Sequence, residues 1–184
     1  KCSKATFNGC LTFVVGENGM DLALRFGLPS EQIIKTGNWL GPLLVAAAEN
    51  SVKQLLLFGY HGKLIKLSGG IFHTHHHLAD GRLEILTSLA VREGISLDLI
   101  QLISTSTSVE NALLALELNN PEVVNLIWSR MAREIEIKSL SYVNRYLSSS
   151  MEIGSVLFDR KRQIRWAGFH GLRQINSLGL ILKS

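Results

Sequence analysis

The sequence predicts an α/β fold with a mainly parallel sheet flanked by helices and a C-terminal β-hairpin. Three short apolar runs in the first third of the chain each end at a glycine, and helical patterns lie between them. Strands that alternate with helices at this spacing imply crossover connections and parallel pairing. The three runs are residues 11–15 before Gly16, residues 33–35 before Gly37, and residues 55–58 before Gly59.

Each remaining element is predicted from its own pattern. Ser108 is placed to cap one helix, Pro121 is tolerated at the start of another, and Gly94 is suited to end a third. Two strand-like runs, residues 153–158 and 163–167, flank a charged turn that we interpret as a solvated hairpin turn. The predicted helices are residues 17–26, 40–49, 79–93, 97–103, 109–118 and 121 to about 147.

Length and composition bound the class of protein. With 184 residues and 46% hydrophobic content, the chain can bury the core of one domain, so we expect a single α/β domain over residues 1–184. No apolar run is long enough to cross a membrane, and Cys2 and Cys10 alone do not indicate a disulfide framework, so we expect a cytoplasmic protein. The net charge of +4 and 7% aromatic content argue against nucleic-acid binding.

The glycine corners predict a ligand site. Ligands of open α/β sheets bind outside the carboxyl ends of the strands, so the three corners are expected to line one crevice. None of the corners has a dinucleotide or triphosphate phosphate-loop pattern. The predicted lining is Gly16, Glu17, Asn18, Gly37, Asn38 and residues 59–63, including Gly59, Gly62 and Lys63.

A histidine cluster follows the third strand. His73, His75 and His77 alternate, so in an extended segment they would point the same way and resemble the opening of a metal-dependent hydrolase site. Such a site needs later ligands, and only His170 follows, so we expect no protein-bound metal. A histidine beside Asp80 is instead suited to proton transfer.

Basic residues near the same segment predict an anion site. Lys63 and Lys66 share a helix face, and with Arg82 they would form a cationic rim suited to a ligand with several carboxylates.

The block GYHGKLIKLSGGIFHTHHHLADGRLEIL resembles the hallmark segment of the CbiD family of anaerobic cobalamin biosynthesis. The flanking segments TGNWLGPLLVAAAENSVKQLLLFG, STSTSVENALLAL and SVLFDRKRQI are also similar to that family, so the resemblance covers almost the whole chain. Because the family's N-terminal half has no counterpart here, the resemblance implies the C-terminal domain of a longer two-domain protein that would be inactive as this chain alone.

The resemblance implies S-adenosylmethionine-dependent methyl transfer to C-1 of cobalt-precorrin-5B. The implied partners are the cobalt-precorrin macrocycle and the missing N-terminal domain, and a homo-oligomer stays open. His75 and Asp80 would handle the proton. Matching positions assign cofactor binding to Gly59 and Gly62, and substrate binding to Lys63, Lys66, Gly70, Thr74 and Arg82. The glycine corners add Gly16, Gly37 and Asn38 as expected cofactor-binding residues.

The chain departs from the family pattern at several positions. Where the family usually has His, Ile, Asn, Ser and Ala, this chain has Tyr60, His61, His73, His76 and Gly81. Two alternatives stay open: a metal-dependent hydrolase that uses His73, His75 and His77, and a non-catalytic tetrapyrrole-binding module.

Overall fold

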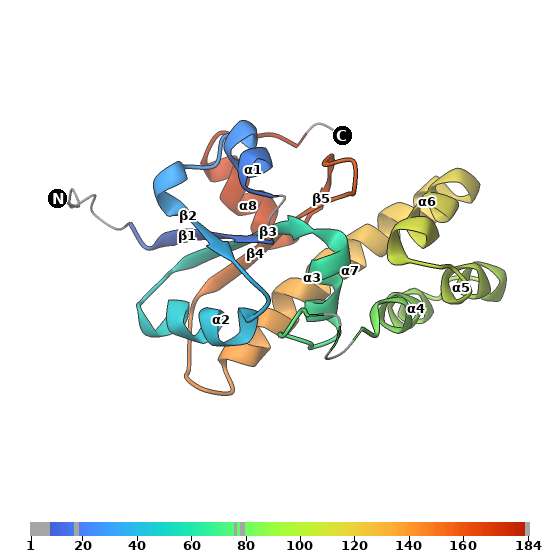
Figure 1. The fold of residues 1–184 in the computed structure, drawn as a ribbon, viewed down its shortest axis with the longest axis horizontal. Coiled ribbons are helices and arrows are strands. Elements are labelled where there is room, and N and C mark those ends of the chain that lie inside the picture. The colour runs from blue at the N-terminus through green and yellow to red at the C-terminus, as the bar shows by residue number, and fades with distance from the viewer. Residues whose placement is uncertain (1–7, 17–18, 76, 78–79, 183–184) are drawn as a thin grey trace.

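One mainly parallel sheet organises the molecule (Figure 1). The computed structural model describes residues 8–16, 19–75, 77 and 80–182. Within those ranges the sheet has five strands in the order β2-β1-β3-β4-β5, with the first four parallel and β5 antiparallel to β4. The predicted fold class is therefore confirmed. The strands are β1 (Cys10–Val15), β2 (Ile33–Thr36), β3 (Gln54–Tyr60), β4 (Glu152–Phe158) and β5 (Ile164–Ala167).

Helices cover both faces of the sheet and extend beyond it. In Figure 1, α1 and α8 lie on one face, α2, α3 and the long α7 lie on the other, and α4, α5 and α6 form a helical layer beside α7. The helices are α1 (Met20–Phe26), α2 (Leu40–Glu49), α3 (His61–Ser68), α4 (Arg82–Arg92), α5 (Leu97–Ser104), α6 (Val109–Asn119), α7 (Pro121–Val143) and α8 (Phe169–Ser177), with a short 3-10 turn, η2 (Ser30–Gln32), before β2.

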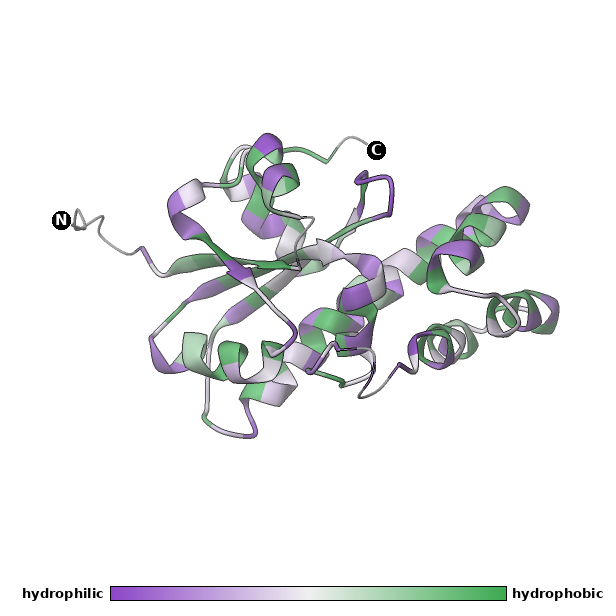
Figure 2. Ribbon diagram, in the orientation of Figure 1, coloured by the Kyte–Doolittle hydropathy of each residue, from purple (hydrophilic) through white to green (hydrophobic). Residues whose placement is uncertain are grey.

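Residues 55–58 of strand β3 are all apolar because both faces of the strand are covered. Leu55 and Leu57 belong to the core beneath α2, α3 and α7, whereas Leu56 and Phe58 belong to the core beneath α1 and α8. A continuous apolar run is typical of a central parallel strand, since successive side chains point to opposite buried faces. In Figure 2 the central strands of the sheet are coloured largely as hydrophobic, and the C-terminal end of β3 is pale.

The register brings the carboxyl ends of the parallel strands to one edge. Val15 pairs with Thr36 on one side and with Gly59 on the other, and Gly59 in turn pairs with Leu157 of β4. The predicted meeting of the three glycine-bearing segments at one edge is thus confirmed. Gly59 itself lies inside β3, so the third corner falls at Tyr60 and His61 instead.

Local helix signals in the sequence are confirmed where the structure describes them. The Ser108 Oγ accepts a hydrogen bond from Asn111 N at 3.2 Å at the start of α6. The predicted stripe of α7 is buried at every position except Leu140, which is partly buried against the same core. That stripe consists of Val124, Ile127, Trp128, Met131, Ile135 and Leu140.

The structure corrects several predicted boundaries. Helix α4 begins at Arg82 and α7 ends at Val143, and α1 begins at Met20. The predicted starts Glu17 and Ala79 lie outside the described residues. Helix α8 follows the hairpin, in a segment for which the sequence analysis predicts no element. Within the described part of the chain, no helix is both long enough and apolar enough to span a membrane.

Candidate functional site

A pocket of about 610 Å³ lies where the strand order reverses. From β1 the chain moves to β2 on one side and then returns to β3 on the other side, so the carboxyl ends of β1 and β3 flank a topological switch point. Open α/β sheets bind ligands at such points because the connecting loops diverge there. We call this cavity the switch-point pocket. Its glycine, tyrosine and charged lining residues are Gly16, Tyr60, Lys63, Arg82, Glu110, Asp159, Arg160 and Arg162.

Gly16 forms the wall of the pocket at the end of β1. Its φ of 91° is a left-handed conformation that favours glycine, and its N–H donates to Thr36 O at 3.1 Å. A Cβ added at Gly16 would lie 2.7 Å from Lys63 Nζ. Gly16 therefore lets the Lys63 ammonium approach the backbone at the pocket wall.

Four cationic side chains converge on this pocket, namely Lys63, Arg82, Arg160 and Arg162. Arg82 forms a bidentate pair with Asp80, and its guanidinium holds the pKa of the Asp80 carboxyl below the usual range. Arg162 pairs with Asp21 of α1. Both pairs are solvent-exposed, where ion pairs contribute little, so a ligand carboxylate can replace the protein carboxylate at small cost.

Lys66 lies apart from this rim. Its side chain is only 2% exposed, and its Nζ donates to Thr74 O at 3.3 Å. Burial lowers the pKa of the Lys66 amine. The two lysines therefore do not form one cationic surface as predicted. Lys63 lines the pocket, whereas Lys66 lies in the interior beneath the loop that carries Thr74.

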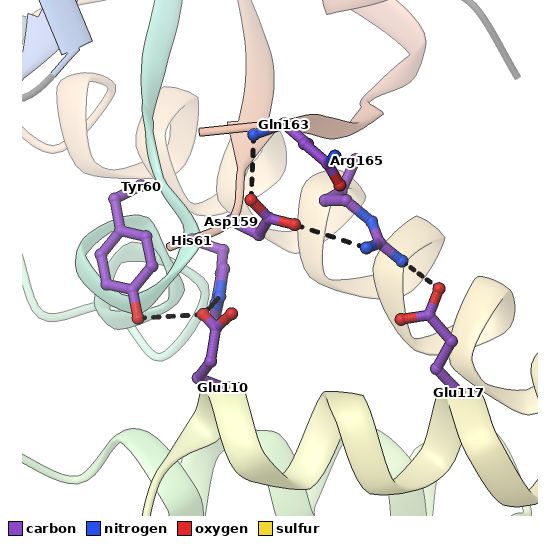
Figure 3. A network of polar contacts seen from close by, with 7 residues as sticks. All are labelled: Tyr60, His61, Glu110, Glu117, Asp159, Gln163 and Arg165. Carbon is purple, nitrogen blue, oxygen red and sulfur yellow. Dashed lines mark hydrogen bonds and ion pairs between the residues drawn. The ribbon is translucent and has the colours of Figure 1, made fainter. Parts of the chain in front are cut away.

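A carboxylate held by two neutral donors lies in the pocket (Figure 3). Oε2 of Glu110, in the first turn of α6, accepts a hydrogen bond from Tyr60 Oη at 3.2 Å and lies 2.7 Å from His61 Nε2. Tyr60 ends β3 and His61 begins α3, so the contact joins the sheet edge to the helical layer. Gly62 permits this arrangement, because a Cβ there would overlap the Tyr60 ring.

Burial sets the protonation of both donors. It raises the pKa of Tyr60 to about 12, and the negative charge of Glu110 acts in the same direction. It lowers the pKa of His61, which is 1% exposed, although the hydrogen bond to Glu110 opposes this shift. Near neutral pH the Tyr60 hydroxyl and the neutral His61 ring are therefore both present as hydrogen-bond donors.

A second group of polar contacts lies beside the first. Asp159 accepts hydrogen bonds from Gln163 N at 2.9 Å and from Arg165 Nη1 at 3.4 Å, and Arg165 also pairs with Glu117 of α6 (Figure 3). The Arg165 guanidinium lies 5.9 Å from the centre of the Trp128 ring. Arg165 thereby joins the β4–β5 hairpin to α6 and α7.

The other predicted glycines do not gather in the pocket. Gly59 is buried, and a Cβ there would lie 3.1 Å from Leu64 and Val15. Gly70 has a φ of 82° at an exposed turn, and a Cβ at Gly37 would meet no atom within 4 Å. Of the predicted glycine corners, Gly16 lines the switch-point pocket.

The loop after α3 is anchored to the segment after β2. Thr74 donates from its backbone N–H to Asn38 O at 2.9 Å and from its hydroxyl to Asn38 Oδ1 at 3.0 Å. The ring of His75 lies 5.1 Å from that of His77 and 6.4 Å from that of His73. The structure thus places His75 among the histidines, while Asp80 pairs with Arg82.

No group of three or more His, Cys, Asp or Glu side chains is arranged to hold a metal ion in the part of the chain that the structure describes. His76, one of the clustered histidines, lies outside that part, as do Glu17 and Asn18 of the predicted crevice.

The sequence prediction missed the pocket residues supplied by α6 and by the turn that follows β4. The sequence pattern predicts only a solvated turn for Asp159–Arg162, because it indicates a hairpin there and gives no sign of a further pairing partner. In the sheet, β4 is also parallel to β3, so this segment shares the edge where ligands bind. Glu110 follows a hydroxyl-rich turn, residues 104–108. That turn is the sequence signal that could have directed attention to Glu110.

Comparison with known proteins decides the family. The family model described as CbiD, C-terminal domain, matches residues 73–168, from the histidine loop to the end of β5. This chain belongs to the CbiD family. The predicted family is thereby confirmed, and the matched CbiD segment includes both Glu110 and Asp159.

Relatives of this CbiD chain come from Prochlorococcus marinus. A protein of strain NATL2A is 84% identical over 183 residues, which cover 100% of this chain and 48% of the relative. A protein of strain SARG is 59% identical with the same coverage, and one of strain MIT 9313 is 56% identical over 174 residues, 95% of this chain and 45% of the relative. All three are named cobalt-precorrin-5B C(1)-methyltransferase. The chain spans about half the length of these relatives, and no solved structure matches it.

Proposed function

We propose that this chain is the C-terminal domain of a protein that transfers a methyl group to C-1 of cobalt-precorrin-5B. The observation that carries the proposal is 84% identity across the whole chain to a relative with that name. The missing half of the protein would supply the rest of the cleft.

The switch-point pocket supports a polycarboxylate substrate. Lys63, Arg82, Arg160 and Arg162 reach it from three different parts of the fold. Arginine binds carboxylates through a planar fork and lysine through a compact charge, and both suit the acetate and propionate side chains of a precorrin. We therefore assign macrocycle binding to this rim.

We propose S-adenosylmethionine as the methyl donor. Its sulfonium is a cation, so within this pocket it would be attracted toward Glu110 and Asp159 and away from the rim. Gly16 is the predicted glycine that lines the same cavity. Holding donor and acceptor in line can contribute roughly 7–11 kcal/mol of the barrier reduction, so positioning is the main task of the pocket.

The test uses the full-length protein with S-adenosylmethionine and cobalt-precorrin-5B. We expect the macrocycle to gain one methyl group by mass spectrometry, with formation of demethylated donor, and this chain alone to give no turnover. Absence of methyl transfer by the full-length protein would overturn the proposal.

Two variants of one turn test the rim. Arg160→Ala should weaken macrocycle binding by about 5- to 10-fold, because it removes a charge-assisted contact at a partly exposed site. Lys161→Ala is the matched control, because Arg160 lines the pocket and the adjacent Lys161 does not. We expect Lys161→Ala to change the dissociation constant by less than about twofold. Equal effects of the two substitutions would contradict the assigned rim.

A further inference from the structure

The environment of Glu110 differs from that of a structural carboxylate. Its side chain is 12% exposed and lines the switch-point pocket. Among the described residues, its hydrogen bonds come from the neutral Tyr60 hydroxyl and from His61, and no Lys or Arg pairs with it. Glu117, two turns further along the same helix, instead pairs with Arg165.

The two oxygens of Glu110 have different surroundings. Oε2 receives both hydrogen bonds, as Figure 3 shows, whereas Oε1 receives none from the residues within the described ranges. Oε1 is also not among the buried polar atoms that lack a partner. One oxygen is therefore fixed by the protein, and the other is accessible and has no hydrogen bond from the described residues.

The surroundings of His61 hold its ring in place, so that it can fix the orientation of the Glu110 carboxylate. Its ring is 1% exposed, lies edge-on to Trp128 with centroids 5.1 Å apart, and has a buried Nδ1 with no partner among the described residues. A neutral imidazole carries one proton, on either Nδ1 or Nε2. Because only Nε2 has a hydrogen-bond partner here, the carboxylate of Glu110, the proton is assigned to Nε2. His61 acts through Glu110 and is a positioning residue.

We propose that Glu110 accepts the proton that the macrocycle releases on methylation, with Tyr60 and His61 holding its carboxylate in place. This inference rests on the proposed function. An electron pair of the macrocycle forms the new C–CH₃ bond, and the S–CH₃ bond breaks with its pair on sulfur, leaving a neutral thioether. The charge of the macrocycle thereby rises by one unit, and it returns to its original value when a ring proton moves to Glu110 Oε1. Atoms and charge balance without a further reactant.

The sequence alone favours His75 and Asp80 for this step. In the structure Asp80 is an exposed carboxylate held by Arg82, whose guanidinium lowers its pKa, so it is a weak proton acceptor. Glu110, in contrast, lines the pocket, is held by neutral donors, and has one oxygen that receives no hydrogen bond from the described residues.

The experiment compares full-length wild type with Glu110→Gln and Glu117→Gln. Single-turnover methyl transfer from S-adenosylmethionine to cobalt-precorrin-5B gives the rate, calorimetry gives the macrocycle dissociation constant, and circular dichroism checks folding. Removing a general base typically costs about 10²–10⁴-fold in rate. We expect a loss in that range for Glu110→Gln, with macrocycle affinity within about threefold of wild type, and no change beyond about threefold for Glu117→Gln.

A third variant separates positioning from binding. Tyr60→Phe retains the ring and removes the hydroxyl, so it should lower kcat while leaving KM unchanged. A folded Glu110→Gln protein with wild-type rate, or one whose only defect is weaker binding, would overturn the role of Glu110. Inactive wild type would overturn the proposed function itself, and the role of Glu110 would fall with it.

Discussion

His61 shows how one residue links the pocket to stability. Its family counterpart in the resemblance is an apolar isoleucine, and the structure indeed buries it, yet it also carries a hydrogen bond to Glu110. Burial lowers its pKa below 6.5. The unfolded chain therefore binds a proton at a higher pH than the folded chain does.

The sign of the resulting pH dependence follows from linkage. As pH falls from 6.5 through the folded pKa of His61, the unfolded state binds more protons, so the free energy of unfolding decreases. One proton gives at most about 1.4 kcal/mol per pH unit. His61→Gln keeps an N–H donor and cannot titrate, so we expect its urea-derived stability to fall less steeply than wild type between about pH 6.5 and 5. Parallel curves for the two proteins would contradict the buried neutral histidine.

Lys66 and Lys63 illustrate a limit of periodicity at the residue scale. Spacing places both lysines on one helix face, but α3 packs so that Lys63 borders the pocket and Lys66 is covered. A long side chain can follow the protein surface or enter the interior from nearly the same angular position. The packing of the neighbouring loop decides which of the two occurs.

At the scale of elements, helix α8 is held by a carboxylate from α7. Glu136 Oε1 accepts from Ser155 N and Gly171 N, each at 3.0 Å, and its Oε2 accepts from His170 N at 3.2 Å. Helix N-termini expose unpaired N–H groups, and α8 has no side-chain cap of its own. Glu136 therefore caps α8 from a distant element and ties it to β4.

Glu136→Gln should destabilise the chain by about 1–3 kcal/mol. The amide retains one oxygen but turns an NH₂ group toward backbone N–H donors, which leaves a buried group unpaired. Urea unfolding monitored by circular dichroism measures the loss. The control is Glu49→Gln at an exposed helix end, which should stay within about 0.5 kcal/mol of wild type. A wild-type midpoint for Glu136→Gln would exclude the capping role.

At the scale of the whole molecule, one apolar core joins the sheet to the helical layer. The same cluster contains Leu57 of β3, Leu86 of α4, Leu116 of α6 and Ile135 of α7. Such continuity favours a single cooperative unfolding transition.

Two probes test that cooperativity. In a variant with Trp39→Phe and Trp166→Phe, fluorescence reports on Trp128, which is buried in α7 against His61. We expect the urea transitions from Trp128 fluorescence and from far-UV circular dichroism to coincide. Separate midpoints would contradict a single cooperative unfolding transition.

The sequence by itself determined the fold class, the parallel orientation of the first strands and the family. Strand β3 is recognisable because burial on both faces requires a continuous apolar run, and the α6 cap because Ser108 acts within three residues. These signals arise between residues that are close in sequence, so they can be recognised without the structure. The hallmark block needed no structure either, since its residue types and spacing identify it.

Only the tertiary structure decided which residues share the pocket. Glu110 lies 50 residues from Tyr60 in sequence and meets it because the α4–α6 layer folds back over the end of β3. Helix α8 was missed for a related reason, since its cap comes from Glu136, 34 residues before His170. Such contacts depend on packing between distant segments, and no local propensity or periodicity encodes them.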